Sequence, residues 1–151
     1  MQVGDIMNRE VVTVEAQDTF AAAAEVLRRN RISSVVVKEG EQGAAGILTE
    51  RDVVALVAEG LDPNRTTVGE RMTRELITVP PRTDVAEAAR LMAERGVRHL
   101  PVIDRGRLVG MVSIRDLLTW GLQEVTGGHE LPDMERGAAT LSAAADLQRR
   151  R

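Results

Sequence analysis

The chain has 151 residues, a formal net charge of -3 at pH 7 and no Cys. The missing Cys excludes disulfides, thiolate metal sites and thiol nucleophiles, and dispersed charges with only Phe20 and Trp120 as aromatic residues argue against nucleic-acid binding. No apolar signal segment opens the chain and no run approaches a membrane span, so we expect a soluble cytoplasmic protein with no membrane partner.

The first half of the chain predicts a strand, a helix, a hairpin and a second helix. Residues 11–14 form a β-branched run, which favours a strand. Apolar residues then recur at the spacing i, i+3, i+4 and i+7 of one helix face: Phe20, Ala23, Ala24 and Leu27. Asp18 fits the N-cap of this helix and Asn30 its end. Residues 35–48 predict a hairpin around the turn 39–43, and a second helix is expected over roughly residues 50–59.

The second half repeats this order after a linker. Residues 59–64 are rich in helix breakers and mark the linker. The next helix face has the same spacing as the first: Val85, Ala88, Ala89 and Met92. Residues 100–103 and 108–112 predict two strands around a tight turn, and a helix follows over roughly residues 114–122.

The two halves are copies of one another. Val3 matches Val68 at an offset of 65 residues, and beyond one shortened loop the offset is 64. A repeat of roughly 60 residues buries too little surface to be stable alone, so we expect the copies to pack as one module. The predicted fold class is α/β of the α+β type, with two β-α-β-β-α repeats. The expected organisation is a first repeat at 1–60, a linker at 61–67, a second repeat at 68–122 and a tail at 123–151 that is partly helical or disordered.

Each hairpin runs into the motif Gly-h-h-Thr/Ser-x-Arg-Asp, in which h is apolar. The motif starts at Gly46 in the first copy and at Gly110 in the second. One interpretation is structural, because a hydroxyl and a later acid form the capping box of a helix. The other is a nucleotide site, in which the Gly admits a ligand, the helix start and Arg hold phosphate and the Asp accepts from a ribose diol. Its occurrence twice in register favours the nucleotide site.

The chain resembles a tandem pair of CBS domains, the Bateman module, over roughly residues 1–122. The resemblance rests on the doubled motif, on the openings Asp5-Ile6-Met7 and Glu70-Arg71-Met72, and on the run Arg98-His99-Leu100-Pro101-Val102-Ile103-Asp104. Small stand-alone bacterial CBS-pair proteins are the most similar. The resemblance implies two repeats packed about a pseudo-two-fold axis, with two clefts for adenosyl ligands.

The resemblance also implies roles for individual residues. It implies that Asp52 and Asp116 bind ribose hydroxyls and that Thr49 and Ser113 lie near phosphate. The base pocket is expected to be lined, partly through backbone, by Val12-Thr13-Val14 and Ile77-Thr78-Val79-Pro80. The segment that carries Arg98, His99 and Pro101 is expected to border the second cleft.

The two copies differ where the second reads Arg98-His99-Leu100-Pro101 and the first reads Ser33-Ser34-Val35-Val36. We therefore expect the ligand first in the cleft built on Ser113 and Asp116, with Arg98, His99 and Arg115 as candidate phosphate partners. Two alternatives stay open: Arg51 and Arg115 are solvated charges, and His99 is a packed or hydrogen-bonded side chain.

The predicted function is a regulatory module that binds AMP, ADP or ATP, in preference to S-adenosylmethionine, and needs no cofactor or metal. The alternative is a structural dimerisation or protein-interaction module with empty clefts. Catalysis is not expected, because the sequence shows no nucleophile–base constellation. We expect an unidentified downstream protein and a homodimer through the second helix of each repeat, where apolar residues exceed what one buried face needs: Val53, Val54, Leu56, Val57, Leu117 and Leu118.

Overall fold

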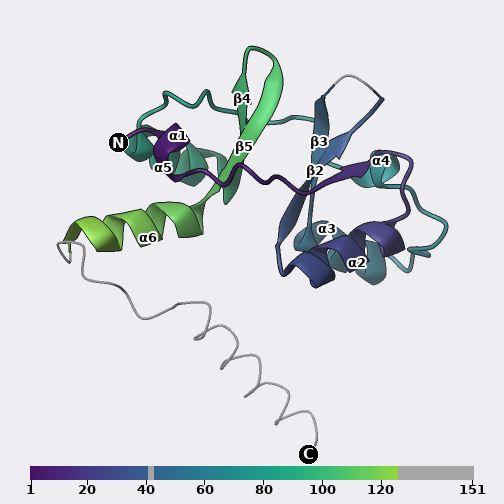
Figure 1. Cartoon of the computed structure of the whole chain (residues 1–151). Coiled ribbons are helices and arrows are strands. Elements are labelled where there is room, and N and C mark those ends of the chain that lie inside the picture. The colour runs from purple at the N-terminus through teal and green to yellow at the C-terminus, as the bar shows by residue number, and fades with distance from the viewer. Residues whose placement is uncertain (41–42, 126–151) are drawn as a thin grey trace, which may run out of the picture. The chain divides into compact units, whose positions relative to one another are not determined.

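A computed structural model describes residues 1–40 and 43–125 of the chain (Figure 1). The first repeat contains α1 (Val3–Ile6), β1 (Thr13–Glu15), α2 (Phe20–Asn30), β2 (Ser34–Lys38), β3 (Ala44–Thr49) and α3 (Glu50–Ala58). The second contains α4 (Val68–Arg71), α5 (Val85–Arg95), β4 (His99–Asp104), β5 (Arg107–Ser113) and α6 (Ile114–Val125). Part of the predicted turn 39–43 and the tail beyond residue 125 lie outside the described residues. In the described part, no helix is long and apolar enough to span a lipid bilayer.

Helices α2 and α5 bury the predicted faces. Fully or nearly buried positions on them are Phe20, Ala23, Leu27, Val85, Ala88 and Met92. Helix α2 ends at Asn30 as predicted, but its N-cap is Thr19, whose Oγ1 accepts the Ala22 N–H at 3.2 Å. Asp18 instead accepts the Glu15 N–H at 2.9 Å, so its carboxylate closes the turn before the helix.

The strands form two sheets. β1, β2 and β3 make one sheet in that order, and β4 pairs with β5 in the other. β1 runs parallel to β2, with Val14 opposite Val37, and β2 runs antiparallel to β3. The β4–β5 turn places Arg105 at φ 48° and Gly106 at φ 78°. Two successive positive φ angles are typical of a type I′ hairpin turn, which confirms the predicted tight turn.

The strand expected at the entry of the second repeat is not formed. Val79 makes a single bridge to Val102, whereas its counterpart Val14 lies in the three-residue strand β1. In the first copy the pairing continues, because the Ala16 N–H donates to the Lys38 carbonyl oxygen at 2.8 Å. The counterpart of Ala16 is Pro81, which has no N–H to donate. The pairing therefore stops after Val79 instead of continuing as it does in the first copy.

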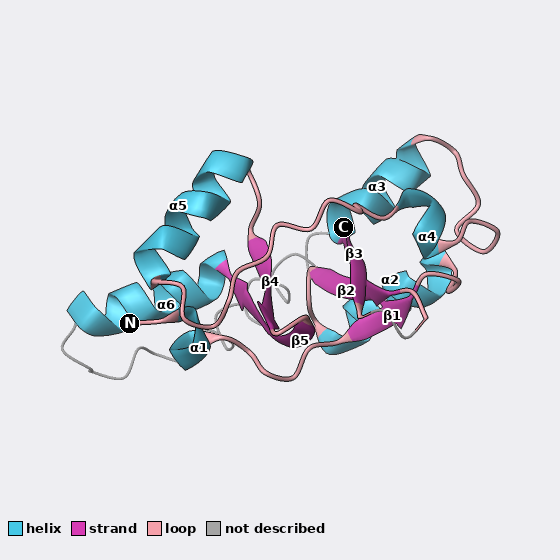
Figure 2. Cartoon of the chain, turned by 90° about the horizontal axis from the view of Figure 1, so that it is seen from above, coloured by secondary structure: helices cyan, strands magenta, loops and turns pink. Residues whose placement is uncertain are grey.

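The leading turn of each repeat packs against the other repeat. The Gly4 N–H donates to the Pro81 carbonyl oxygen at 2.7 Å, and the Gly69 N–H donates to the Ala16 carbonyl oxygen at 2.7 Å. Figure 2 shows α1 near β5, and α4 near the sheet of β1, β2 and β3. These contacts are related by the repeat offset. The two copies therefore exchange their leading turns about a pseudo-two-fold axis and pack as one module, as predicted.

The glycines that open the two motifs make room for this exchange. A Cβ at Gly46 would lie 2.6 Å from the Met72 Sδ and 2.8 Å from the Thr73 carbonyl oxygen. A Cβ at Gly110 would collide with Met7 in the same way. Packing between the repeats, rather than the close approach of a ligand that we expected, explains these glycines.

Candidate ligand-binding site

Both motif acids cap the helix that follows them. The Asp52 Oδ2 accepts the Thr49 N–H at 2.7 Å and the Thr49 hydroxyl at 3.1 Å. The Asp116 Oδ2 accepts the Ser113 N–H and hydroxyl, each at 2.7 Å. The capping-box interpretation is therefore confirmed in both copies. Within the described residues the second oxygen of each carboxylate has no partner, so it is available to accept from a ligand.

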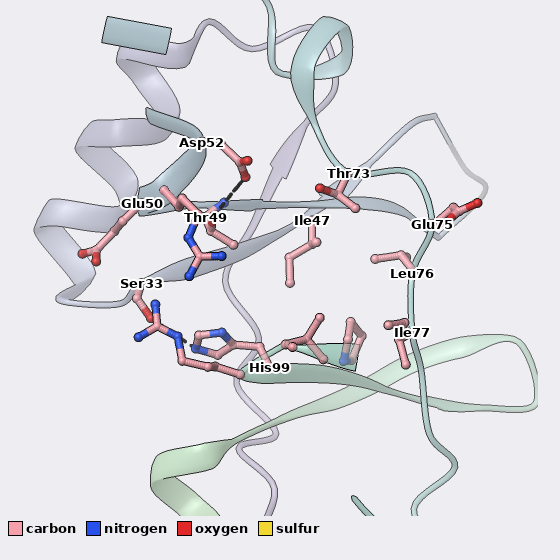
Figure 3. Close-up of a pocket in the computed structure, with 15 residues that line it drawn as sticks. Ser33, Ile47, Thr49, Glu50, Asp52, Thr73, Glu75, Leu76, Ile77 and His99 are labelled. Atoms are coloured by element: carbon pink, nitrogen blue, oxygen red, sulfur yellow. Dashed lines mark hydrogen bonds between the residues drawn. The ribbon is translucent and has the colours of Figure 1, made fainter. Parts of the chain in front are cut away.

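A pocket of ≈ 200 Å³ lies at the start of α3 (Figure 3). Its walls come from both repeats: Ser33, Ile47, Thr49, Glu50, Arg51, Asp52, Thr73, Glu75, Leu76, Ile77, Gly96, Val97, Arg98, His99 and Pro101. Figure 3 shows Leu76 and Ile77 at one end and Ser33, Thr49 and His99 at the other, with Ile47 between them. The pocket thus offers an apolar end and a polar end, which suits a ligand with a flat apolar part and a hydroxylated or charged part.

The structure changes the grouping of the predicted site residues. We expected Arg98 and His99 to join Ser113 and Asp116, but they line the pocket that contains Thr49 and Asp52 of the first copy. A contact across the repeats accompanies this arrangement: the His99 Nε2 lies 3.1 Å from the Ser33 Oγ. This pocket therefore groups Arg98 and His99 with the first copy's motif, and the cleft expected on Ser113 and Asp116 stays a prediction.

The remaining predicted residues divide in the same way. Arg51, Ile77 and Pro101 line the pocket, as the resemblance implied for one cleft or the other. The pocket does not include the following predicted residues: Thr13, Val14, Thr78, Val79, Pro80, Ser113, Arg115 and Asp116. Three of these, Ser113, Arg115 and Asp116, are the copy-related counterparts of the lining residues Thr49, Arg51 and Asp52.

Several lining residues were missed from the sequence: Ser33, Ile47, Glu50, Thr73, Glu75, Leu76, Gly96 and Val97. The repeat offset could have identified Ser33 among them. Ser33 is the counterpart of Arg98, and both line the pocket, one from each repeat. The bridge between Thr73 and Ile47 brings the entry of the second repeat to the first repeat's motif, a contact that sequence spacing alone does not reveal.

The charged side chains of the pocket are not paired with one another. Within the described part of the chain, Arg51 and Arg98 form no ion pair, and neither do Glu50 and Glu75. In Figure 3 the carboxylates of Glu50 and Glu75 point outward at the two margins. Two uncompensated guanidinium groups beside a helix N-terminus favour an anionic group on the ligand.

His99 is half-buried at the polar end. Burial and the neighbouring Arg98 and Arg115 guanidinium groups lower the pKa of the His99 ring, and the nearby Asp116 carboxylate opposes them only in part. The lowered pKa favours the neutral ring near pH 7. His99 is therefore a hydrogen-bonded side chain in the ligand-free protein, as one of our alternatives had it, and not a standing cation.

No group of three or more His, Cys, Asp or Glu suited to a metal ion occurs within residues 1–40 and 43–125. The chemistry offered by the pocket is hydrogen bonding, charge and apolar contact. Such groups suit the binding of a small molecule.

Comparison with known proteins identifies the repeat. The CBS domain family matches residues 3–59 and again residues 68–122. The chain is 33% identical to the CBS domain-containing protein YhcV of Bacillus subtilis over 134 residues, which cover 87% of this chain and 94% of that protein. It is 35% identical to an uncharacterized protein of Methanopyrus kandleri over 120 residues, which cover 78% of this chain but only 61% of that longer protein.

A solved structure supports the same likeness. The CBS domain pair of protein MJ0100, in complex with 5′-methylthioadenosine and S-adenosyl-L-methionine, aligns with a TM-score of 0.75 and 26% identity. The alignment covers 82% of this chain and 98% of that one. This chain thus shares its fold with that CBS domain pair.

Proposed function

The chain belongs to the CBS-domain family, with two copies of the domain in tandem, and on this premise we propose that it is a regulatory module that senses an adenosine-containing ligand. We place the ligand in the pocket between the repeats and assign it to the AMP, ADP or ATP class in preference to S-adenosylmethionine. Regulation requires that the ligand favour one of two states of the protein. The regulated partner and a cytoplasmic location stay predictions.

One observation carries this proposal: a single pocket combines the Thr49–Asp52 capping box with Arg98 and His99 of the other repeat. A ribose diol is suited to the Asp52 oxygen that makes no hydrogen bond within the described chain. Phosphate is suited to Arg51 and Arg98, beside the N–H groups at the start of α3. The apolar end of the pocket then accommodates the adenine ring between aliphatic side chains, since neither Phe20 nor Trp120 lines the pocket.

Two matched variants test the pocket. Asp52 and Asp116 have the same capping role, but only Asp52 lines the pocket. Asp52→Ala and Asp116→Ala should each cost about 0.5–2 kcal/mol of folding stability through the lost cap. Only Asp52→Ala should weaken AMP binding in isothermal titration, by about 1–3 kcal/mol or roughly 5- to 150-fold in Kd. Equal affinities in the two variants would contradict the assignment.

The ligand class is tested on the wild-type protein. Titration with AMP, ADP, ATP, S-adenosylmethionine and 5′-methylthioadenosine should give tighter binding for the phosphorylated ligands, because the pocket holds two unpaired guanidinium groups. Tighter binding of S-adenosylmethionine would reassign the class. No binding of any of these at roughly millimolar concentration would reject the nucleotide proposal.

Exposed apolar side chains on α3 and α6 support the alternative function, a dimerisation module. On α3, Val54 and Val57 are 67% and 66% exposed, and on α6 the counterpart of Val54, Leu118, is 59% exposed. Leu56 and Leu117, which we had also counted as surplus, are buried instead. An exposed apolar position that recurs in both copies suits an isologous homodimer, which is compatible with ligand binding.

Dimerisation is tested by mass. Light scattering after size exclusion should give about twice the chain mass of 16.4 kDa. Val54→Glu combined with Val57→Glu should give a monomer, since two charges on the face oppose its burial. Ala86→Glu, at an exposed position of α5, is the matched control and should stay dimeric. A monomeric wild-type protein would reject the homodimer.

We also propose that the pocket is not catalytic. Ser33 and His99 do lie within hydrogen-bond distance, like a nucleophile and a base. Such a pair needs a third group that orients the base, and within the described residues the His99 ring has no hydrogen bond besides the one with Ser33. Nucleotide turnover that disappears in Ser33→Ala would overturn this view.

A further inference from the structure

His99 occupies the junction between the two repeats. It is the first residue of β4 and lines the pocket, where its Nε2 lies 3.1 Å from the Ser33 Oγ of the first repeat. In the β4–β5 pairing it lies opposite Ser113, the hydroxyl residue of the second motif. One imidazole ring therefore contacts the polar end of the pocket and neighbours the second capping box.

The charges around this ring are unbalanced in the ligand-free protein. On its own strand entry lies Arg98, and at the start of α6 lie Arg115 and Asp116. The other charged groups that share the pocket come from the start of α3 and from the entry of the second repeat: Glu50, Arg51, Asp52 and Glu75. Arg51 and Arg98 have no ion-pair partner among the described residues, whereas one Asp52 oxygen is held by its cap. Asp116 therefore compensates the positive charge of Arg98 and Arg115 around the ring only in part.

We propose that His99 is the specificity-determining residue of the pocket: it takes up a proton when a ligand with a phosphate group binds. The pocket then prefers phosphorylated over unphosphorylated adenosyl ligands more strongly as pH falls. This inference rests on the proposed nucleotide-binding function. It adds a selectivity mechanism that the fold alone does not supply, because the mechanism depends on the ring at position 99, where the first copy has Ser34.

The direction of the pH effect follows from linkage. In the ligand-free protein burial, Arg98 and Arg115 lower the pKa of His99, so the ring is neutral near pH 7. A phosphate beside the ring favours the protonated form and raises that pKa. The complex then binds more protons than the free protein, so affinity rises as pH falls from about 8 toward the lowered pKa of the free ring. An uncharged ligand produces no such rise.

Isothermal titration in two buffers of different ionisation enthalpy measures this proton uptake. At about pH 6.5 wild-type protein should take up a fraction of a proton with AMP, and none with 5′-methylthioadenosine. Between about pH 8 and 6.5 the preference for AMP should grow by roughly 3- to 10-fold. His99→Gln keeps a hydrogen-bonding side chain and should abolish this growth. The phosphate of AMP titrates too, but it does so equally with both proteins, so their difference isolates His99.

A second measurement, the NMR titration of the His99 ring, does not depend on whether His99→Gln folds. The chain has two His residues, so His129→Gln assigns the two imidazole C–H signals in a proton spectrum. The His99 signal should titrate below the ordinary His range without ligand and shift upward with AMP. An unchanged midpoint, or equal pH dependence of AMP binding in His99→Gln, would overturn this inference and leave the proposed function standing. Absence of AMP binding at every pH would reject both.

Discussion

Arg31 and Gly96 occupy the same position in the two repeats, one residue after the first long helix. Both have a left-handed backbone, with φ 54° at Arg31 and φ 63° at Gly96. In both copies the N–H of this residue closes the last helical turn. A residue with a Cβ is strained in this conformation by about 1–2 kcal/mol, whereas Gly is not. The first repeat therefore carries a strain that the second avoids.

Arg31→Gly should stabilise the protein. Relief of the strain outweighs the greater chain entropy of Gly in the unfolded state, so the free energy of unfolding should rise by about 0.5–1 kcal/mol. Urea denaturation with unchanged m-value measures this. Gly96→Ala is the matched control in the other repeat and should lose about 1 kcal/mol or more. A less stable Arg31→Gly protein would show that the Arg side chain contributes more than its backbone costs.

Among the elements, α4 and the segment after it are held against β3 by a close backbone approach. Gly46→Ala should therefore destabilise the protein by about 1–3 kcal/mol, because the Thr73 carbonyl oxygen is backbone and cannot move aside as a side chain can. Gly121, inside α6, has nothing within 4 Å of an added Cβ. Gly121→Ala should gain about 1 kcal/mol from helix propensity. Thermal melting that ranks the two variants the other way would contradict this packing.

Elements with local signals were predictable from the sequence. The apolar spacing of α2 and α5, the end of α2 at Asn30 and the two-residue turn of the second hairpin are confirmed. The strand expected near Val79 is reduced to a single bridge. The cause is the missing N–H of Pro81, and not a low β propensity of the residues. The N-cap of α2 is Thr19 and not the predicted Asp18, because the Asp18 carboxylate accepts an N–H of the preceding turn instead.

For the whole molecule, the sequence predicted two copies packed as one module, but not which side chains meet. The pairing of Arg98 and His99 with Thr49 and Asp52 depends on the exchange of leading turns between repeats. Two arrangements are compatible with the same spacing, because residues at copy-related positions have similar types. Long-range contacts such as the bridge between Thr73 and Ile47 decide between these two arrangements. Such contacts cannot be predicted from the local sequence pattern.

The central claim is that a ribonucleotide binds in the pocket shared by Thr49, Asp52, Arg98 and His99. The most direct measurement is a crystal structure of the protein with AMP. We expect ribose density within hydrogen-bond distance of Asp52, phosphate density toward Arg98 and His99, and the base beside Ile77. Density for AMP only at Ser113 and Asp116, or no density with AMP far above its measured Kd, would contradict the claim.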